Sequence, residues 1–305
     1  TTILVFALGC NFETEMVVKT GTDTFGNAPK LMIGITIDQM RSDYLIRYSP
    51  HFSKGGFVRI QEDGFTCYDH HFGYAPTYTG PGHASIFTGT TPAIHGIVAN
   101  DWYLREYKSS VYCTSDDSVF GVGVNGIDED GTVFGLSGKM SPKRMLTSTI
   151  GDELKLSTGM KSKVIGISLK DRGAILPAGH AADGAYWFYG MDKGHFITST
   201  YYGEEMTDWA KEFNKKTEVE SLINLGWELL YEPDTYEACW PDNNPYEGPF
   251  VGALKATFPY DLSVLKEKNG GFDILKGTPG GNTILVDFAL AAIEGEGLGL
   301  DEITD

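Results

Sequence analysis

The chain has 305 residues, and its 41 acidic residues against 24 Lys and Arg give a formal net charge of −17 at pH 7. This acidic balance argues against nucleic acid as a partner and suits a soluble acidic protein. The sequence contains no run of 18 apolar residues, so it predicts no transmembrane segment. The cysteines, Cys10, Cys67, Cys113 and Cys239, lack the spacing of a metal site.

The first ten residues form an apolar run that ends in Gly9-Cys10. Such a run before a small residue resembles the end of a secretory signal, and Cys10 would then be a lipoprotein-type anchor. The alternative is an N-terminal strand. We expect residues 1–28 to be a signal or lipoprotein remnant followed by a polar tether. The protein would then be exported, either to the periplasm or to the outer membrane through a lipid on Cys10.

Residues 30–38 are the first predicted core element, an Ile-rich apolar run that ends in Asp38. A short run of this kind predicts a buried parallel strand. Ligands of open α/β sheets bind beyond the carboxyl ends of the strands, where Asp38 would lie. The alternative role for Asp38 is to cap a helix in residues 39–48.

Thr79 precedes Gly80-Pro81 and a short helix-like run. Because proline is favoured in the first helical turn, Thr79 should lie at or just before a helix N-terminus. Free N–H groups and the helix dipole favour negative charge there, so the Thr79 hydroxyl would ionise more easily and an anion would bind beside it. The alternative is that Thr79 is only an N-cap.

Two further segments place polar side chains after apolar stretches. Asn100 is an uncharged hydrogen-bond donor at the end of one such stretch, or else a turn residue. Residues 163–169 predict another buried strand, followed by Lys170, Asp171 and Arg172. Lys170 and Arg172 could hold a phosphoryl group, since arginine binds two oxygens at once and lysine acts as a point charge. The alternative is a solvated turn with an internal ion pair.

The expected architecture is α/β, with a mostly parallel central sheet and helices on both faces. Residues 29–184 would form the first part of the core, with a helix that begins near Ser141. Residues 185–281 would be a hairpin (185–190 and 195–202) and a cap-like insertion, because residues 220–280 are aromatic, irregular and rich in Pro and Gly. Residues 282–305 would return to the core, starting with a helix.

Four segments together resemble the alkaline phosphatase superfamily, namely residues 37–43, 79–83, 96–100 and 168–173. The nearest resemblance is to the phosphate-irrepressible periplasmic alkaline phosphatases of Bacteroidetes-type bacteria, from about residue 30 onward. It implies that Thr79 is the nucleophile of a phosphothreonine intermediate and that Asp38 and Thr79 are zinc ligands. It also implies that Asn100, Lys170 and Arg172 bind phosphoryl oxygens. Asp171 should then point away from this group, since neighbours on an extended chain face opposite sides.

The resemblance implies two zinc ions, whose other ligands in this family are an Asp-x-x-x-His motif, an Asp-His pair and a lone His. We expect these beyond Asp305, and we do not expect Asp69-His70-His71 to replace them. The chain would be the N-terminal part of a monomeric enzyme that hydrolyses small phosphate monoesters, with poor zinc binding and negligible turnover alone. The alternatives are a phosphodiesterase or nucleotide pyrophosphatase of the same superfamily, or a non-catalytic fragment or binding module.

Overall fold

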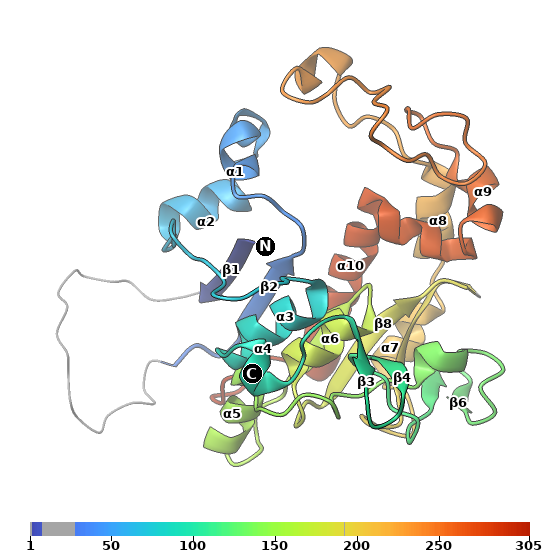
Figure 1. Ribbon diagram of the computed structural model, residues 1–305. Helices are drawn as coiled ribbons and strands as arrows, with labels where there is room; N and C mark the ends of the chain where they lie inside the picture. Colours follow the sequence, from blue (N-terminus) through green and yellow to red (C-terminus); the bar gives the residue numbers. More distant parts are fainter. Residues whose placement is uncertain (1, 8–27, 192) are drawn as a thin grey trace, which may run out of the picture.

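The computed structural model of the chain describes residues 2–7, 28–191 and 193–305. It has an α/β fold around a five-stranded sheet in the order β6-β5-β9-β8-β7, with separate pairs β1-β2 and β3-β4 (Figure 1). The strands are β1 Thr2–Ala7, β2 Met32–Ile37, β3 Asp101–Leu104, β4 Ser109–Tyr112, β5 Gly121–Gly123, β6 Gly126–Asp128, β7 Ile165–Ser168, β8 Gly184–Tyr189 and β9 His195–Ser199.

The α-helices are α1 Tyr44–Arg47, α2 Phe57–Asp63, α3 Thr79–Thr88, α4 Pro92–His95, α5 Ile150–Ser157, α6 Asp171–Ala178, α7 Asp208–Asn214, α8 Glu218–Leu225, α9 Leu262–Leu265 and α10 Pro279–Glu296. Short 3₁₀ helices are η1 Ser49–His51, η2 Gly135–Gly138, η3 Pro233–Tyr236, η4 Lys266–Lys268 and η5 Gly271–Gly277. Within the described ranges, no helix is both long and apolar enough to cross a membrane.

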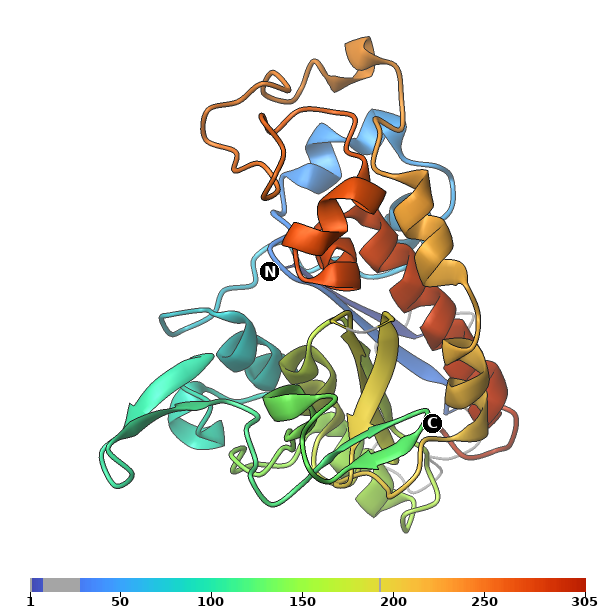
Figure 2. The ribbon, with the colours of Figure 1, turned by 90° about the vertical axis from the view of Figure 1, so that its right-hand side faces the viewer.

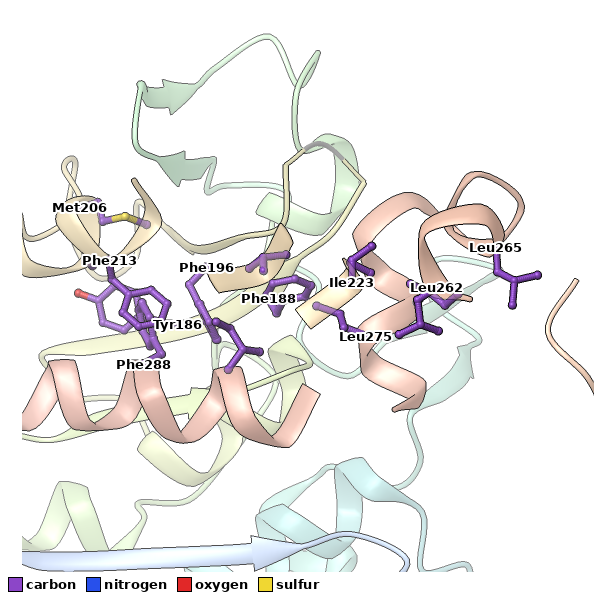
Figure 3. Packing of buried hydrophobic residues seen from close by; sticks show 14 of the residues in the cluster. Tyr186, Phe188, Phe196, Met206, Phe213, Ile223, Leu262, Leu265, Leu275 and Phe288 are labelled. Carbon is purple, nitrogen blue, oxygen red and sulfur yellow. The ribbon is translucent and has the colours of Figure 1, made fainter. Parts of the chain in front are cut away.

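Helices cover both faces of the five-stranded sheet, as the alternation along β8 shows. Tyr186 and Phe188 pack into a cluster with residues of α7, α8 and α10, while Ala185 and Trp187 pack into a second cluster with residues of α6. Successive side chains of a strand point to opposite faces, so β8 is covered on both sides. In Figure 3, Phe288 of α10 lies among the core side chains, and its ring stacks on that of Phe196 with 3.8 Å between centroids.

The predicted α/β fold is confirmed, but the sheet is mixed rather than mostly parallel. Only β7 and β8 pair in parallel among the described strands, because hairpins connect β5 to β6 and β8 to β9. The hairpin expected at residues 185–202 is present as β8 and β9. It occupies the middle of the sheet, so it belongs to the core and not to a cap.

The helix expected from Ser141 begins later, at Ile150 of α5. A capping box fixes this start, because the Thr149 side chain accepts the N–H of Asp152 and the Asp152 carboxylate accepts the N–H of Thr149. Ser141 instead donates its hydroxyl proton to the buried carboxylate of Asp116 at 2.7 Å. The serine is therefore used for a tertiary contact rather than as a cap.

The strand expected at residues 30–38 is β2, but it is not buried, and Ile35 for example is 47% exposed. It pairs antiparallel with β1. At its start, Asp305 N donates to Lys30 O at 3.0 Å and Met32 N donates to Asp305 O at 2.8 Å, a parallel-type pattern. The Asp305 carboxylate also accepts Lys163 N–H, just before β7. The expected tether, with Cys10, lies outside the described residues.

The irregular segment between α8 and α9 extends toward α1 and η1, as the orange loop in Figure 2 shows. The Tyr48 hydroxyl lies 3.6 Å from Cys239 Sγ, and the rings of His51 and Tyr231 are 6.1 Å apart. At the base of the segment, Trp227 and Tyr260 form a β-bridge, which closes the loop on itself. This segment therefore touches the helices that follow β2 and Asp38.

Candidate active site

Thr79 and Asp38 are brought together by the start of α3 and the end of β2. Thr79 is the first residue of α3, as the sequence predicted, and Asp38 directly follows β2. The Thr79 hydroxyl donates to Asp38 Oδ2 at 2.9 Å, and Gln39 N–H donates to Asp38 Oδ1 at 3.0 Å. Gln39 has φ of +59°, which is uncommon for a residue other than glycine. A tight turn thus fixes the carboxylate beside the hydroxyl.

Asn100 is oriented by the first turn of α3. Its Oδ1 accepts the N–H of Gly80 at 2.7 Å, which leaves the amide Nδ2 free to donate elsewhere. A Cβ on Gly80 would lie 3.1 Å from Asn100 Oδ1 and 3.2 Å from Ala99 O, so a larger residue would push these neighbours away by a few tenths of an ångström. The amide is held where a donor can reach an anion bound at the helix start.

Lys170 and Arg172 lie at the N-terminus of α6, where Lys170 is the N-cap. Arg172 Nη1 donates to the Tyr112 hydroxyl at 2.7 Å, while Arg172 Nε is buried and has no hydrogen-bond partner among the described residues. Lys170 is exposed, and within the described part of the chain no ion pair engages its ammonium group. Both cations are therefore available to an anion.

Asp171 is not paired with either neighbouring cation. Its Oδ1 accepts hydroxyl protons from Tyr112 at 2.7 Å and from Thr114 at 2.8 Å. The internal ion pair considered for this triplet is therefore not the observed arrangement. The sequence reasoning missed Tyr112 and Thr114, and it missed the contact of Gly80 with Asn100, because no local spacing links residues that lie 20 to 60 positions apart.

A chain of contacts joins the two halves of the site. Asn100 O accepts the N–H of Cys113 at 2.8 Å, and Cys113 is the residue between Tyr112 and Thr114. Helices α3 and α6 pack side by side in the middle of Figure 1. Four predicted residues, Asp38, Thr79, Asn100 and Arg172, thus belong to one connected cluster, and Lys170 adjoins it at the start of α6.

His83 lies one turn along α3, and charged groups from both halves of the site affect its pKa. Its Nδ1 hydrogen-bonds to Thr79 O at 2.9 Å. Burial lowers the pKa of His83, although the Thr79 carbonyl and the Asp38 carboxylate raise it and Arg172 lowers it further. The positive dipole ends of two helices, α3 and α6, lie at a cluster that holds a hydroxyl, a carboxylate, an amide and a guanidinium.

Side chains that could bind a metal ion do not cluster among the described residues. Across the described residues, no group of three or more His, Cys, Asp and Glu side chains could hold a metal ion. Asp69 and His71 form an exposed pair at 2.7 Å. Asp38 and Thr79 together offer two adjacent oxygen atoms, a partial ligand set.

The arrangement offers an anion hydrogen-bond donors and positive charge, and comparisons with known proteins show the family of the chain. Residues 32–257 match the family described as type I phosphodiesterase / nucleotide pyrophosphatase. The chain therefore belongs to this family, which is part of the alkaline phosphatase superfamily. The resemblance to that superfamily inferred from the four segments is confirmed.

The chain is similar to several named bacterial proteins. It is 47% identical over 279 residues to a "Calcium-transporting ATPase" of Myroides odoratus and 44% identical over 278 residues to alkaline phosphatase PafA of Elizabethkingia meningoseptica. It is 41% identical over 277 residues to alkaline phosphatase PhoV of Synechococcus elongatus. Each alignment covers 91% of this chain but only 48–49% of the relative. The chain thus spans about half the length of these curated relatives.

The fold is also similar to that of solved PafA structures. The crystal structure of wild-type PafA superimposes with a TM-score of 0.86 at 44% identity, over 92% of this chain and 52% of PafA. A PafA variant with one Thr replaced by Ser, and an Asn, a Lys and an Arg each replaced by Ala, gives a TM-score of 0.85. The alkaline-phosphatase-like fold is thereby confirmed.

Proposed function

We propose that this chain carries the nucleophile and the phosphoryl-binding groups of a zinc-dependent phosphatase that hydrolyses phosphate monoesters through a phosphothreonine at Thr79. The observation that carries the proposal is the 2.9 Å hydrogen bond from Thr79 to Asp38 at the start of α3. Support comes from PafA, because the residue types replaced in its variant are those of Thr79, Asn100, Lys170 and Arg172, in the same order.

The Thr79 hydroxyl is set up as a nucleophile by its hydrogen bond. Its proton points at Asp38, so the lone pairs of Oγ1 are free to attack phosphorus. In the first step the bond from phosphorus to Thr79 Oγ1 forms and the ester P–O bond breaks, while the proton that the Thr79 hydroxyl loses is taken up by the leaving alcohol. In the second step water attacks the phosphothreonine, which releases phosphate and restores the hydroxyl.

Side-chain donors at the start of α3 and at the start of α6 hold the phosphoryl group. Asn100 Nδ2 and the guanidinium of Arg172 can each donate to a non-bridging oxygen, and the Lys170 ammonium adds a second positive charge. Groups held in place before the reaction stabilise charge that develops on these oxygens in the transition state. A monoester dianion carries one more charged oxygen than a diester, so the two cations favour monoesters.

The residues present fit zinc in part. Asp38 and Thr79 would hold one ion, since carboxylate and alkoxide oxygens are suitable zinc ligands, and the remaining ligands are expected beyond Asp305. Zinc, when bound, lowers the pKa of the nucleophile and stabilises the leaving oxygen. Because the described residues supply only these two ligands, we propose that zinc binding and turnover need the sequence that follows. We also propose that the protein is exported, that it carries a lipid on Cys10 and that it is a monomer.

The experiment that tests the function uses the whole protein that carries this chain. We expect Lys170→Ala and Arg172→Ala each to lower kcat/KM for an aryl phosphate monoester by about 10- to 100-fold, and to affect a diester much less. Lys161→Ala is the matched control, since Lys161 is an exposed lysine before β7 whose ammonium group forms no ion pair within the described residues. Equal losses for monoester and diester would favour the phosphodiesterase alternative.

A further inference from the structure

Tyr112, at the end of β4, connects two charged residues of α6. Its hydroxyl is 2.7 Å from Arg172 Nη1 and 2.7 Å from Asp171 Oδ1. A phenol has one proton to donate, and a guanidinium can only donate. The direction of both bonds is therefore fixed, with Arg172 donating to Tyr112 and Tyr112 donating to Asp171.

The Asp171 end of this relay is itself anchored. Thr114 donates its hydroxyl proton to the same oxygen, Asp171 Oδ1, at 2.8 Å, and the Thr114 side chain is fully buried. Asp171 also lies in the first turn of α6, where the helix dipole stabilises a negative charge. The carboxylate thus has two hydroxyl donors and a favourable field, which keep it in one place.

The Tyr112 hydroxyl stays protonated under ordinary conditions. Burial raises the pKa of Tyr112 far above its ordinary value of 10, and the charge of Asp171 raises it further, which outweighs the opposing effect of Arg172. The Arg172 guanidinium also lies over the Tyr112 ring, with 5.8 Å from Cζ to the centroid. Ring and hydroxyl together restrict the arginine, whose long side chain would otherwise sample many rotamers.

Tyr112 also lies next to the residue that contacts the other half of the site. The N–H of Cys113 donates to Asn100 O at 2.8 Å, and a Cβ on Gly80 would lie 3.4 Å from Cys113 Sγ. The short segment 112–114 therefore contacts both Arg172 on α6 and Asn100, whose amide lies at the start of α3.

We propose that Tyr112, anchored by Asp171, is a positioning residue that holds the Arg172 guanidinium in the geometry needed to bind the phosphoryl group. This inference rests on the proposed function, because it gives Arg172 a phosphoryl oxygen to bind. It adds that the selectivity for monoesters depends on a tyrosine that does not touch the substrate.

The test is a double-mutant cycle on the whole protein, with Tyr112→Phe, Arg172→Ala and the double variant. Each is assayed with p-nitrophenyl phosphate and with bis-p-nitrophenyl phosphate. We expect Tyr112→Phe to lower monoester kcat/KM about tenfold and diester kcat/KM less than about twofold. In the Arg172→Ala background, the same substitution should change monoester kcat/KM less than about twofold, because its target is gone. Tyr186→Phe is the control, since it removes a buried tyrosine hydroxyl that contacts Thr207.

Two results would overturn the inference. The first is that Tyr112→Phe lowers monoester kcat/KM by the same factor in the unmodified protein and in Arg172→Ala. The second is that Tyr112→Phe keeps full monoester activity while Arg172→Ala loses it. Either result would leave the proposed function standing. Full monoester activity in Arg172→Ala, or none in the unmodified protein, would refute the function and this inference together. If Tyr112→Phe does not fold, Asp171→Asn tests the relay from its other end and should show the same selective loss.

Discussion

The backbone N–H of Gly80, in the first turn of α3, holds the side-chain amide of Asn100 through a hydrogen bond and close packing. The Gly80 N–H donates to Asn100 Oδ1 at 2.7 Å, and a Cβ on Gly80 would come within 3.1 Å of the same atom. The contact sets which end of the amide faces the site. Gly80 therefore orients the Asn100 amide, which we propose binds a phosphoryl oxygen.

Gly80→Ala should lower monoester kcat/KM about tenfold, because the new methyl group displaces the Asn100 amide by a few tenths of an ångström. Steady-state kinetics of the whole protein measures this. Gly82→Ala is the matched control in the same helical turn, since a Cβ there would meet no atom within 4 Å. Unchanged kinetics in Gly80→Ala would show that the orientation of Asn100 does not matter.

His95 should make stability depend on pH. It is fully buried, its Nδ1 accepts Ile97 N–H at 3.1 Å, and Nε2 therefore donates to Ser85 Oγ at 2.9 Å in the neutral form. Burial lowers the pKa of His95 from 6.5 to about 4, with a smaller opposing effect of its own backbone.

The unfolded chain therefore binds a proton at His95 before the folded chain does. Its contribution is complete above pH 6.5 and is lost as the pH falls toward 4, with a limit of about 3 kcal/mol. Urea unfolding at several pH values measures this, and His95→Gln should flatten the dependence in that window. An unaltered pH dependence in the variant would contradict the assignment.

Tyr202→Phe should leave the stability unchanged or raise it. Its hydroxyl is buried and has no hydrogen-bond partner within the part of the chain that the structure describes, so it carries an uncompensated desolvation cost. Burial also raises the pKa of Tyr202 well above 10. Thermal unfolding compares this variant with Tyr186→Phe, which loses a hydrogen bond and should be destabilised by about 1 kcal/mol. A clear loss of stability in Tyr202→Phe would reveal a missing partner.

Thiol reagents should distinguish the cysteines of the described residues. Cys67 and Cys239 are exposed, whereas Cys113 is fully buried. Burial raises the pKa of Cys113 to about 12, with a further contribution from Asp171, so almost no thiolate forms. Iodoacetamide treatment of the folded protein followed by peptide mapping should modify Cys67 and Cys239 but not Cys113. Fast modification of Cys113 would mean that the segment beneath Asn100 opens readily.

The sequence predicted the parts of the site that depend on local pattern. Strand ends placed Asp38 and Lys170, and Gly80-Pro81 placed Thr79 at the start of α3. It did not predict the sheet order, because the turn at residues 191–194 indicates a hairpin without showing where the hairpin packs. Tyr112 was missed for a similar reason, since a contact across 60 residues depends on how α6 packs and leaves no periodic signal.

The prediction of a helix start at Ser141 was wrong, because the Ser141 side chain hydrogen-bonds to Asp116 instead of capping a helix. Ser141-Pro142 has the pattern of a helix start, but the buried Asp116 carboxylate needs hydrogen bonds from Ser118, Ser141 and Lys143. Burial alone would raise the pKa of Asp116, and these donors outweigh it and hold the pKa well below its ordinary value. The need of the buried Asp116 carboxylate for hydrogen bonds therefore outweighed the preference of Ser141 for a helix N-cap.

The most direct test of the central claim is to locate the phosphoryl group after the reaction is stopped. The whole protein is mixed with a monoester, quenched in acid and mapped by mass spectrometry, with Thr79→Ala and Thr79→Ser alongside. We predict phosphate on Thr79 in the unmodified protein, phosphate on the serine in Thr79→Ser, and none at this position in Thr79→Ala. Catalytic turnover without any phosphorylation at Thr79, or undiminished labelling of Thr79→Ala, would contradict it.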